Sequence, residues 1–143
     1  MKLQIVNNDD ESIEGFISLK IGEDFKTTLS QLVDNSCTEV LLLDILDTME
    51  YEQSFEFLVS VLKKIRSNGS IILRGVSSLS FAHSLLNGPI DSKQASGIIG
   101  NIRSIHDQRD VTNLLESNNF TVDTLRLSGV VYELKATRQT NAS

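Results

Sequence analysis

The chain has 143 residues, of which 40% are hydrophobic and 22% are charged, as in an ordinary globular protein. This length predicts a fold that buries roughly two thirds of its unfolded surface and needs no metal or disulfide for stability. The formal net charge of −6 argues against binding to nucleic acid or to an anionic membrane. Cys37 is the one cysteine and cannot form an internal disulfide, so we expect a cytoplasmic protein without a membrane span.

The first part of the chain predicts short strands. Residues 3–6, 16–21 and 39–45 are apolar runs of strand length, and the third run is apolar on both faces. A run of that kind is typical of a strand buried between two layers of helices. Only nine residues separate Val6 from Phe16, which is too few for the usual helical connection between parallel strands.

The strongest helix is predicted over residues 51–67. Its apolar positions recur at spacings of three and four residues, as in an amphipathic helix. They are Phe55, Leu58, Leu62 and Ile65, with Val59 and Val61 beside them. The Asn-Gly pair 68–69 is expected to end the helix, and residues 70–74 predict the next strand. A strand, a helix and a strand in this order predict a parallel βαβ unit with a right-handed connection.

The second part of the chain predicts helices followed by a hairpin. Residues 78–105 predict one or two short helices, divided at the Asn-Gly-Pro sequence 87–89. Asp107 is expected to be the N-cap of a further helix. Residues 120–127 and 130–136 then alternate apolar and polar side chains around a Ser-Gly pair, which predicts a β-hairpin.

Together these elements predict an α/β fold, with a mostly parallel Rossmann-like sheet, helices on both faces and a C-terminal antiparallel hairpin. No repeat or linker divides it, so we expect one domain over residues 1–137 and a polar tail over residues 138–143. Open α/β sheets bind ligands at the carboxyl ends of their strands. Asp44 and Asp47 come at the end of the central buried run, so both are candidate site residues.

Five strings of the sequence carry a resemblance to a known family. They are residues 14–21, 34–40, 45–49, 62–74 and 111–120. In order and spacing they resemble strings of the class I, S-adenosylmethionine-dependent methyltransferases, and in particular of a compact subgroup called methyltransferase type 11-like. The resemblance implies a Rossmann-like fold, S-adenosylmethionine as the methyl donor and methyl transfer as the activity.

By that resemblance, the residues that bind the donor are largely replaced here. The family has a glycine-rich turn after the first strand, which lets the backbone approach the donor closely, whereas Asn7 and Asn8 stand here, followed by three acidic residues. The family's acid at the end of the second strand accepts hydrogen bonds from the ribose hydroxyls, but Lys20 stands there. Asp44 and Asp47 remain as candidates on the other side of the site. We therefore expect weak or absent binding of S-adenosylmethionine, and no metal.

Other polar residues have a structural interpretation beside a functional one. Residues 7–11 fit a solvated turn better than a remodelled pocket, and Asp47 fits a helix N-cap about as well as a ligand-binding residue. Histidine suits general-base chemistry, but His106 has no evident carboxylate partner beyond its neighbour in sequence. His83 is expected to be partly buried. Cys37 has no nearby histidine and is not expected to be a nucleophile.

Two functions fit these observations. The favoured one is a degenerate methyltransferase-like domain that acts as a non-catalytic binding or assembly module. The alternative is a small S-adenosylmethionine-dependent methyltransferase with an atypical donor site, acting on a small molecule, a glycan or a protein. Because short connections leave part of the sheet uncovered, we expect a protein partner or a homo-oligomer, with contact at a sheet edge or an apolar helix face.

Overall fold

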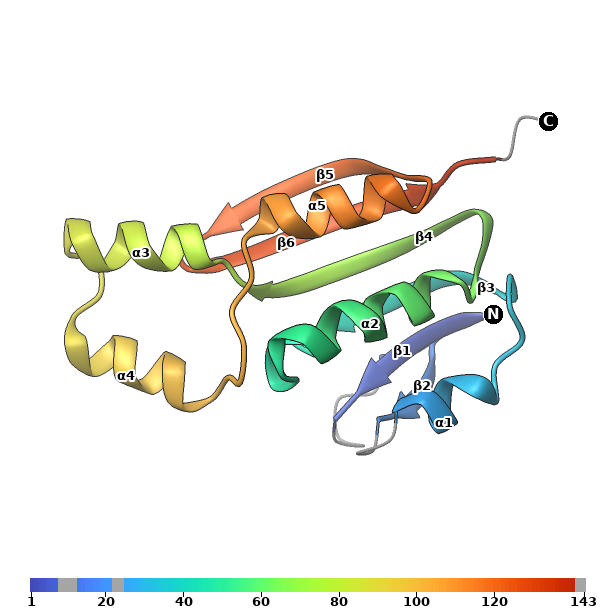
Figure 1. Cartoon of the computed structure of the whole chain (residues 1–143), viewed down its shortest axis with the longest axis horizontal. Coiled ribbons are helices and arrows are strands. Elements are labelled where there is room, and N and C mark those ends of the chain that lie inside the picture. Colours follow the sequence, from blue (N-terminus) through green and yellow to red (C-terminus); the bar gives the residue numbers. More distant parts are fainter. Residues whose placement is uncertain (8–12, 22–24, 141–143) are drawn as a thin grey trace.

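The computed structural model of the chain describes residues 1–7, 13–21 and 25–140, which contain a six-stranded sheet. The strands are β1 (Lys2–Val6), β2 (Ile17–Lys20), β3 (Cys37–Leu43), β4 (Ile65–Val76), β5 (Phe120–Ser128) and β6 (Val131–Arg138). They lie in the order β2-β1-β3-β4-β6-β5 (Figure 1). The first four strands are parallel, and β6 runs antiparallel to both β4 and β5. The predicted α/β fold, with a mostly parallel sheet and a C-terminal hairpin, is confirmed.

Two of the predicted helix boundaries, at residues 88 and 107, agree with the structure. The helices are α1 (Phe25–Ser30), the 3-10 turn η2 (Leu46–Thr48), α2 (Tyr51–Leu62), α3 (Ser78–Asn87), α4 (Ser92–Gly100) and α5 (Gln108–Ser117). Gly88, in the Asn-Gly-Pro sequence, ends α3 in the left-handed conformation with φ of 88°. Asp107 caps α5 as predicted, because its carboxylate accepts the backbone N–H of Arg109 at 2.8 Å. Within the described residues, no helix is long and apolar enough to cross a membrane.

The hydrophobic core lies between one face of the sheet and the helices α1, α2 and α5 (Figure 1). The sheet contributes matched rows of side chains, since Leu3, Val40, Ile71 and Ala136 are successive partners in the register. α3 has no buried residue, and α4 buries only Ala95, which lies outside this core. The helices that enclose this core, α1, α2 and α5, therefore lie on one face of the sheet.

The helix α2 is shorter than predicted, and its buried face includes Phe57 in place of Phe55. It ends at Leu62 rather than at residue 67, and Ile65 already belongs to β4, where it pairs with Cys37. Asn68 adopts φ of 65° within an irregularity of the β3–β4 pairing and does not end the helix. The buried residues of α2 are Ser54, Phe57, Leu58, Val61 and Leu62, whereas Phe55 is only half-buried. Phe57 was missing from the predicted stripe because that stripe was extended through residues that form a strand.

Candidate functional site

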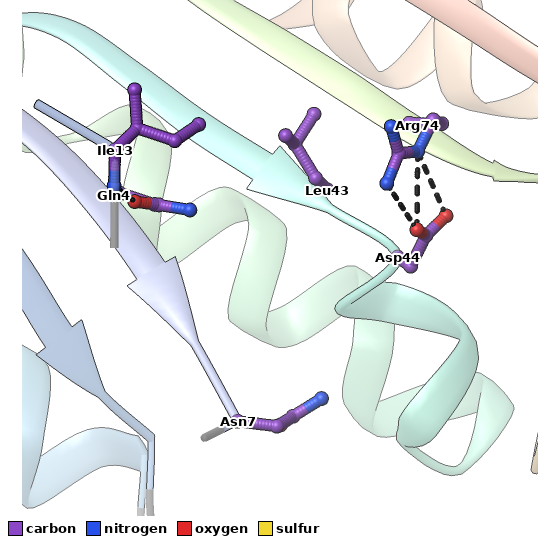
Figure 2. A pocket seen from close by; sticks show the side chains of 6 residues that line it. All are labelled: Gln4, Asn7, Ile13, Leu43, Asp44 and Arg74. Carbon is purple, nitrogen blue, oxygen red and sulfur yellow. Dashed lines mark hydrogen bonds and ion pairs between the residues drawn. The ribbon is translucent and has the colours of Figure 1, made fainter. Parts of the chain in front are cut away.

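A cavity of about 320 Å³ opens at the carboxyl ends of β1 and β3, where ligands bind to sheets of this kind (Figure 2). Its lining residues are Gln4, Asn7, Ile13, Leu43, Asp44 and Arg74. Gln4 and Arg74 alternate with core residues along their strands, so the cavity lies on the sheet face that carries no helix. The Gln4 side chain also holds Ile13 over this face, because its Oε1 accepts the backbone N–H of Ile13 at 2.9 Å.

An ion pair between Arg74 and Asp44 occupies one wall of this cavity (Figure 2). Arg74 Nη2 donates to Asp44 Oδ2 at 2.5 Å, and Arg74 Nε lies 3.2 and 3.1 Å from the two carboxylate oxygens. The Asp44 backbone N–H also donates to the carbonyl of Arg74 at 2.9 Å. Both oxygens of Asp44 are therefore engaged by a cation from the neighbouring strand.

Asn7 stands between this cavity and a second one of about 340 Å³. The second cavity lies toward the helices and is lined by Asn7, Ile21, Phe25, Thr48, Met49, Gln53 and Arg103. Asn7 Nδ2 reaches across to Thr48 Oγ1 at 3.5 Å. The structure thus brings Asn7 and Asp44 together around one cavity, as their predicted roles at one site require.

Asp47 does not line either cavity, because it lies inside the protein beneath them. Its side chain is 4% exposed, its Oδ2 accepts the backbone N–H of Val76 at 2.9 Å, and its Oδ1 lies 3.7 Å from His106 Nδ1. Asp47 is not a helix N-cap either, since that position of α2 belongs to Glu50. Its carbonyl also accepts the backbone N–H groups of Arg103 and Ser104 at 2.7 and 3.2 Å. Asp47 therefore joins η2 to β4 and to the segment before α5.

His106 is completely buried and has the carboxylate partner that sequence reasoning missed. Its Nε2 lies 2.7 Å from Ser54 Oγ, and its Nδ1 faces Asp47. Its ring stacks on Tyr51 and meets Phe55 edge-on, with centroids 5.3 and 5.4 Å away. Ser54, His106 and Asp47 form a spatial row with the histidine in the middle. However, Ser54 and His106 have no exposed surface. A substrate has no access to them, so the arrangement is a packed polar network and not a nucleophile site.

Tyr132 and Gly75 complete this network on the sheet side. A Cβ on Gly75 would lie 3.0 Å from Asp47 Oδ1 and 3.1 Å from the Tyr132 hydroxyl, so a larger residue there would push these groups aside by a few tenths of an ångström. The Tyr132 hydroxyl is buried and has no hydrogen-bond partner among the described residues. Burial raises the pKa of the Tyr132 phenol, and the carboxylates of Asp47 and Asp44 raise this pKa further.

Tyr132→Phe is expected to leave the free energy of unfolding at neutral pH unchanged, or to raise it by up to about 1 kcal/mol, because the lost hydroxyl is unpaired. The raised pKa keeps the phenol neutral in the folded state. The stability that depends on the neutral phenol is therefore fully present below the unfolded-state pKa of about 10, and it is lost as the pH rises above that value. Urea unfolding at about pH 8 and about pH 11 measures both effects. Wild type should lose more stability between these two values than the variant. A variant destabilised at neutral pH would show that the hydroxyl is bonded.

The remaining predicted residues are not brought into the cavities. Lys20 ends β2 with an exposed side chain and lines neither cavity, and Asn8 lies outside the described residues. His83 is exposed on α3, so the prediction of partial burial was wrong. Cys37 is fully buried at the start of β3. Among the described residues, no group of three or more histidine, cysteine, aspartate or glutamate side chains is placed to hold a metal.

Solved structures of methyltransferases resemble this chain. An O-methyltransferase family protein from Burkholderia thailandensis matches with a TM-score of 0.64 and 11% identity, over 88% of this chain and 36% of its own. A SAM-dependent methyltransferase from Archaeoglobus fulgidus matches with a TM-score of 0.63 and 15% identity, over 94% of this chain and 74% of its own. A putative type 11 methyltransferase from Sulfolobus solfataricus matches with a TM-score of 0.57 and 17% identity, over 99% of this chain and 73% of its own.

The chain has the class I methyltransferase fold. The predicted resemblance is therefore confirmed for the fold. No protein-family model and no curated protein matches the sequence. Several structures with this fold contain S-adenosylmethionine or S-adenosylhomocysteine. The chain spans little more than a third of the Burkholderia protein, so that protein includes a large part without a counterpart here.

Proposed function

We propose that this methyltransferase-like domain is a non-catalytic binding or assembly module. The observation that carries the proposal is the Arg74–Asp44 ion pair in the cavity at the carboxyl ends of β1 and β3. Asp44 is the acid best placed in that cavity to receive the donor's amino group. The donor's amino group would share this carboxylate with Arg74, which places two cations side by side in the cavity. Asn7 adds a side chain at the position where the family has glycine.

Loss of the ribose-binding acid supports the same proposal. A carboxylate that accepts hydrogen bonds from two ribose hydroxyls contributes roughly 1.5–3 kcal/mol for each bond. Lys20 stands at that position, has no acceptor atom and points into solvent. Losing both bonds lowers the affinity by roughly two to four orders of magnitude. The replaced residues thus weaken donor binding at two separate parts of the ligand.

A small S-adenosylmethionine-dependent methyltransferase with an atypical donor site is the second candidate. The two cavities that meet at Asn7 favour it, because they lie at the switch point where sheets of this class bind ligands. Its substrate would be a small molecule, a glycan or a protein. The two candidates differ in one property, which is whether the chain binds the donor.

A thermal unfolding experiment with about 1 mM S-adenosylmethionine separates them. A dissociation constant of about 10 μM would stabilise the folded chain by about 2.7 kcal/mol at this concentration, which raises Tm by several degrees. We expect Tm to stay unchanged with S-adenosylmethionine and with S-adenosylhomocysteine. A rise of several degrees with either compound would favour the enzyme instead.

A further inference from the structure

The contacts of the buried His106 ring determine which of its nitrogens carries hydrogen. Ser54 Oγ lies 2.6 Å from the carbonyl oxygen of Tyr51 and 2.7 Å from His106 Nε2. A serine hydroxyl has one hydrogen, and a carbonyl oxygen can only accept one. Ser54 must therefore donate to the Tyr51 carbonyl. The second short contact then requires that His106 Nε2 donates its own hydrogen to Ser54 Oγ.

The other ring nitrogen faces a carboxylate. His106 Nδ1 lies 3.7 Å from Asp47 Oδ1, and neither atom has a hydrogen-bond partner among the described residues. A neutral ring with its hydrogen on Nε2 would turn the lone pair of Nδ1 toward this carboxylate oxygen, and the two buried acceptors would repel each other. A second hydrogen on Nδ1 removes this repulsion and gives the buried carboxylate a counter-charge.

The surroundings of the ring fit a positive charge. The His106 ring stacks on that of Tyr51 with centroids 5.3 Å apart and planes inclined by 14°, and an aromatic face attracts a cation at such a distance. The carboxylate of Asp107 is engaged by Arg109 at 2.7 Å. The ionisable groups of the elements around the ring are Asp47 of η2, Tyr51 of α2, Tyr132 of β6 and Asp107 before α5. Of these, Asp47 supplies the charge that faces the ring.

This pair of residues lies beneath the second cavity and connects two segments that line it. The Asp47 carbonyl accepts the backbone N–H groups of Arg103 and Ser104 at 2.7 and 3.2 Å. Arg103 lines the second cavity, and so does Thr48, the residue after Asp47. An attraction between the Asp47 and His106 side chains therefore holds residues 103–106 against η2 and keeps Arg103 in place at the cavity.

We infer that His106 is a positively charged positioning residue, paired with Asp47, that fixes Arg103 at the second cavity. The position of Arg103 then depends on pH, because loss of the Nδ1 proton leaves a buried carboxylate and a buried acceptor face to face. The inference goes beyond the proposed function, since it does not depend on whether the donor binds.

NMR spectra of the isotope-labelled full chain test the charge, because protonated and unprotonated imidazole nitrogens differ widely in chemical shift. The chain has two histidines, so His83→Gln identifies the signals of His106. We expect both ring nitrogens of His106 to carry hydrogen at neutral pH. Asp47→Asn keeps the shape of the side chain but removes its charge, so it should leave one ring nitrogen unprotonated. Asp107→Asn is the matched control and should leave both protonated, since Asp107 caps α5 and asparagine is also a good cap.

Hydrogen exchange of the Arg103 and Ser104 amides measures the positioning. In wild type, the protection of both amides should fall at the pH at which the His106 ring loses its second proton. The amide of Leu73, in the core strand β4, is the reference for the intrinsic effect of pH on exchange. In Asp47→Asn, both amides should exchange roughly tenfold faster than in wild type at neutral pH, because the segment opens more often.

A wild-type His106 ring with an unprotonated nitrogen at neutral pH would overturn the inference, whether or not the variants fold. Loss of the second proton in Asp107→Asn but not in Asp47→Asn would also overturn it, since another carboxylate would then be the partner. Unchanged exchange of the Arg103 and Ser104 amides in an Asp47→Asn variant with a neutral ring would contradict the positioning role. The donor experiment is unaffected by these outcomes, because it measures binding of a different molecule.

Discussion

Phe57→Ala is expected to lower the free energy of unfolding by about 3–5 kcal/mol. Phe57 has no exposed surface, and its ring meets that of Phe25 edge-on, with centroids 5.4 Å apart. Truncation removes this contact and leaves a cavity between α2 and the sheet, which a densely packed core fills only in part. A loss of this size is a large share of the stability of a domain of this length. Urea unfolding followed by circular dichroism measures it.

Phe55→Ala is the matched control on the same helix. Phe55 is half-buried, and its main ring contacts are with Tyr51 and His106. We expect a loss of about 1–2 kcal/mol, within the usual range for partly buried positions. The apolar spacing in the sequence predicts the opposite order, with Phe55 inward. A larger loss for Phe55→Ala than for Phe57→Ala would contradict the observed orientation of α2.

Asp47→Ala is expected to lower the free energy of unfolding by about 2–4 kcal/mol. The change leaves the buried N–H of Val76 without its acceptor and removes the carboxylate that faces His106. It also empties a space inside the protein that alanine does not fill. Urea unfolding at neutral pH measures the loss.

Asp34→Ala is the control for removing an aspartate from an ion pair at the surface. Asp34 pairs with Lys64 at 2.6 Å, but its side chain is 60% exposed. Exposed pairs contribute little to stability because water screens them, so the loss should be much smaller than for Asp47→Ala. Equal losses in the two variants would mean that Asp47 is not part of a buried network.

Local signals in the sequence were sufficient for most of the fold. Alternation around Gly129 predicts the hairpin of β5 and β6, and Gly129 indeed adopts φ of 59°. The caps at Asp107 and Gly88 were visible because each depends on a few adjacent residues. The apolar runs predicted the positions of the parallel strands, because the composition of a short apolar segment is enough to indicate a buried strand.

Features that depend on distant residues were not visible in the sequence. Asp47 and His106 are 59 positions apart, so no local spacing connects them. The apolar character of β3 on both faces predicts two helical layers, yet Leu41 is buried on the face without a helix. There it lies between Gln4 and Ile72 of the neighbouring strands. Side chains of adjacent strands can therefore bury a central residue in place of a helix.

The candidate site was predicted in part. Asn7 and Asp44 do line one cavity, because the carboxyl ends of parallel strands meet at one edge of the sheet. Arg74 was not predicted as their neighbour, since its position depends on the register between β3 and β4. That ion pair is the feature on which the proposed loss of donor binding most directly rests.

Calorimetric titration of the full chain with S-adenosylmethionine and with S-adenosylhomocysteine tests the non-catalytic role most directly. Arg74→Ala and Arg126→Ala are informative companions, because both remove an arginine near the open sheet face and only Arg74 contacts Asp44. We expect wild type and Arg126→Ala to show no binding tighter than about 1 mM, and Arg74→Ala to bind slightly better but still weakly. A dissociation constant in the low micromolar range for wild type would contradict this account and make the chain a donor-binding methyltransferase.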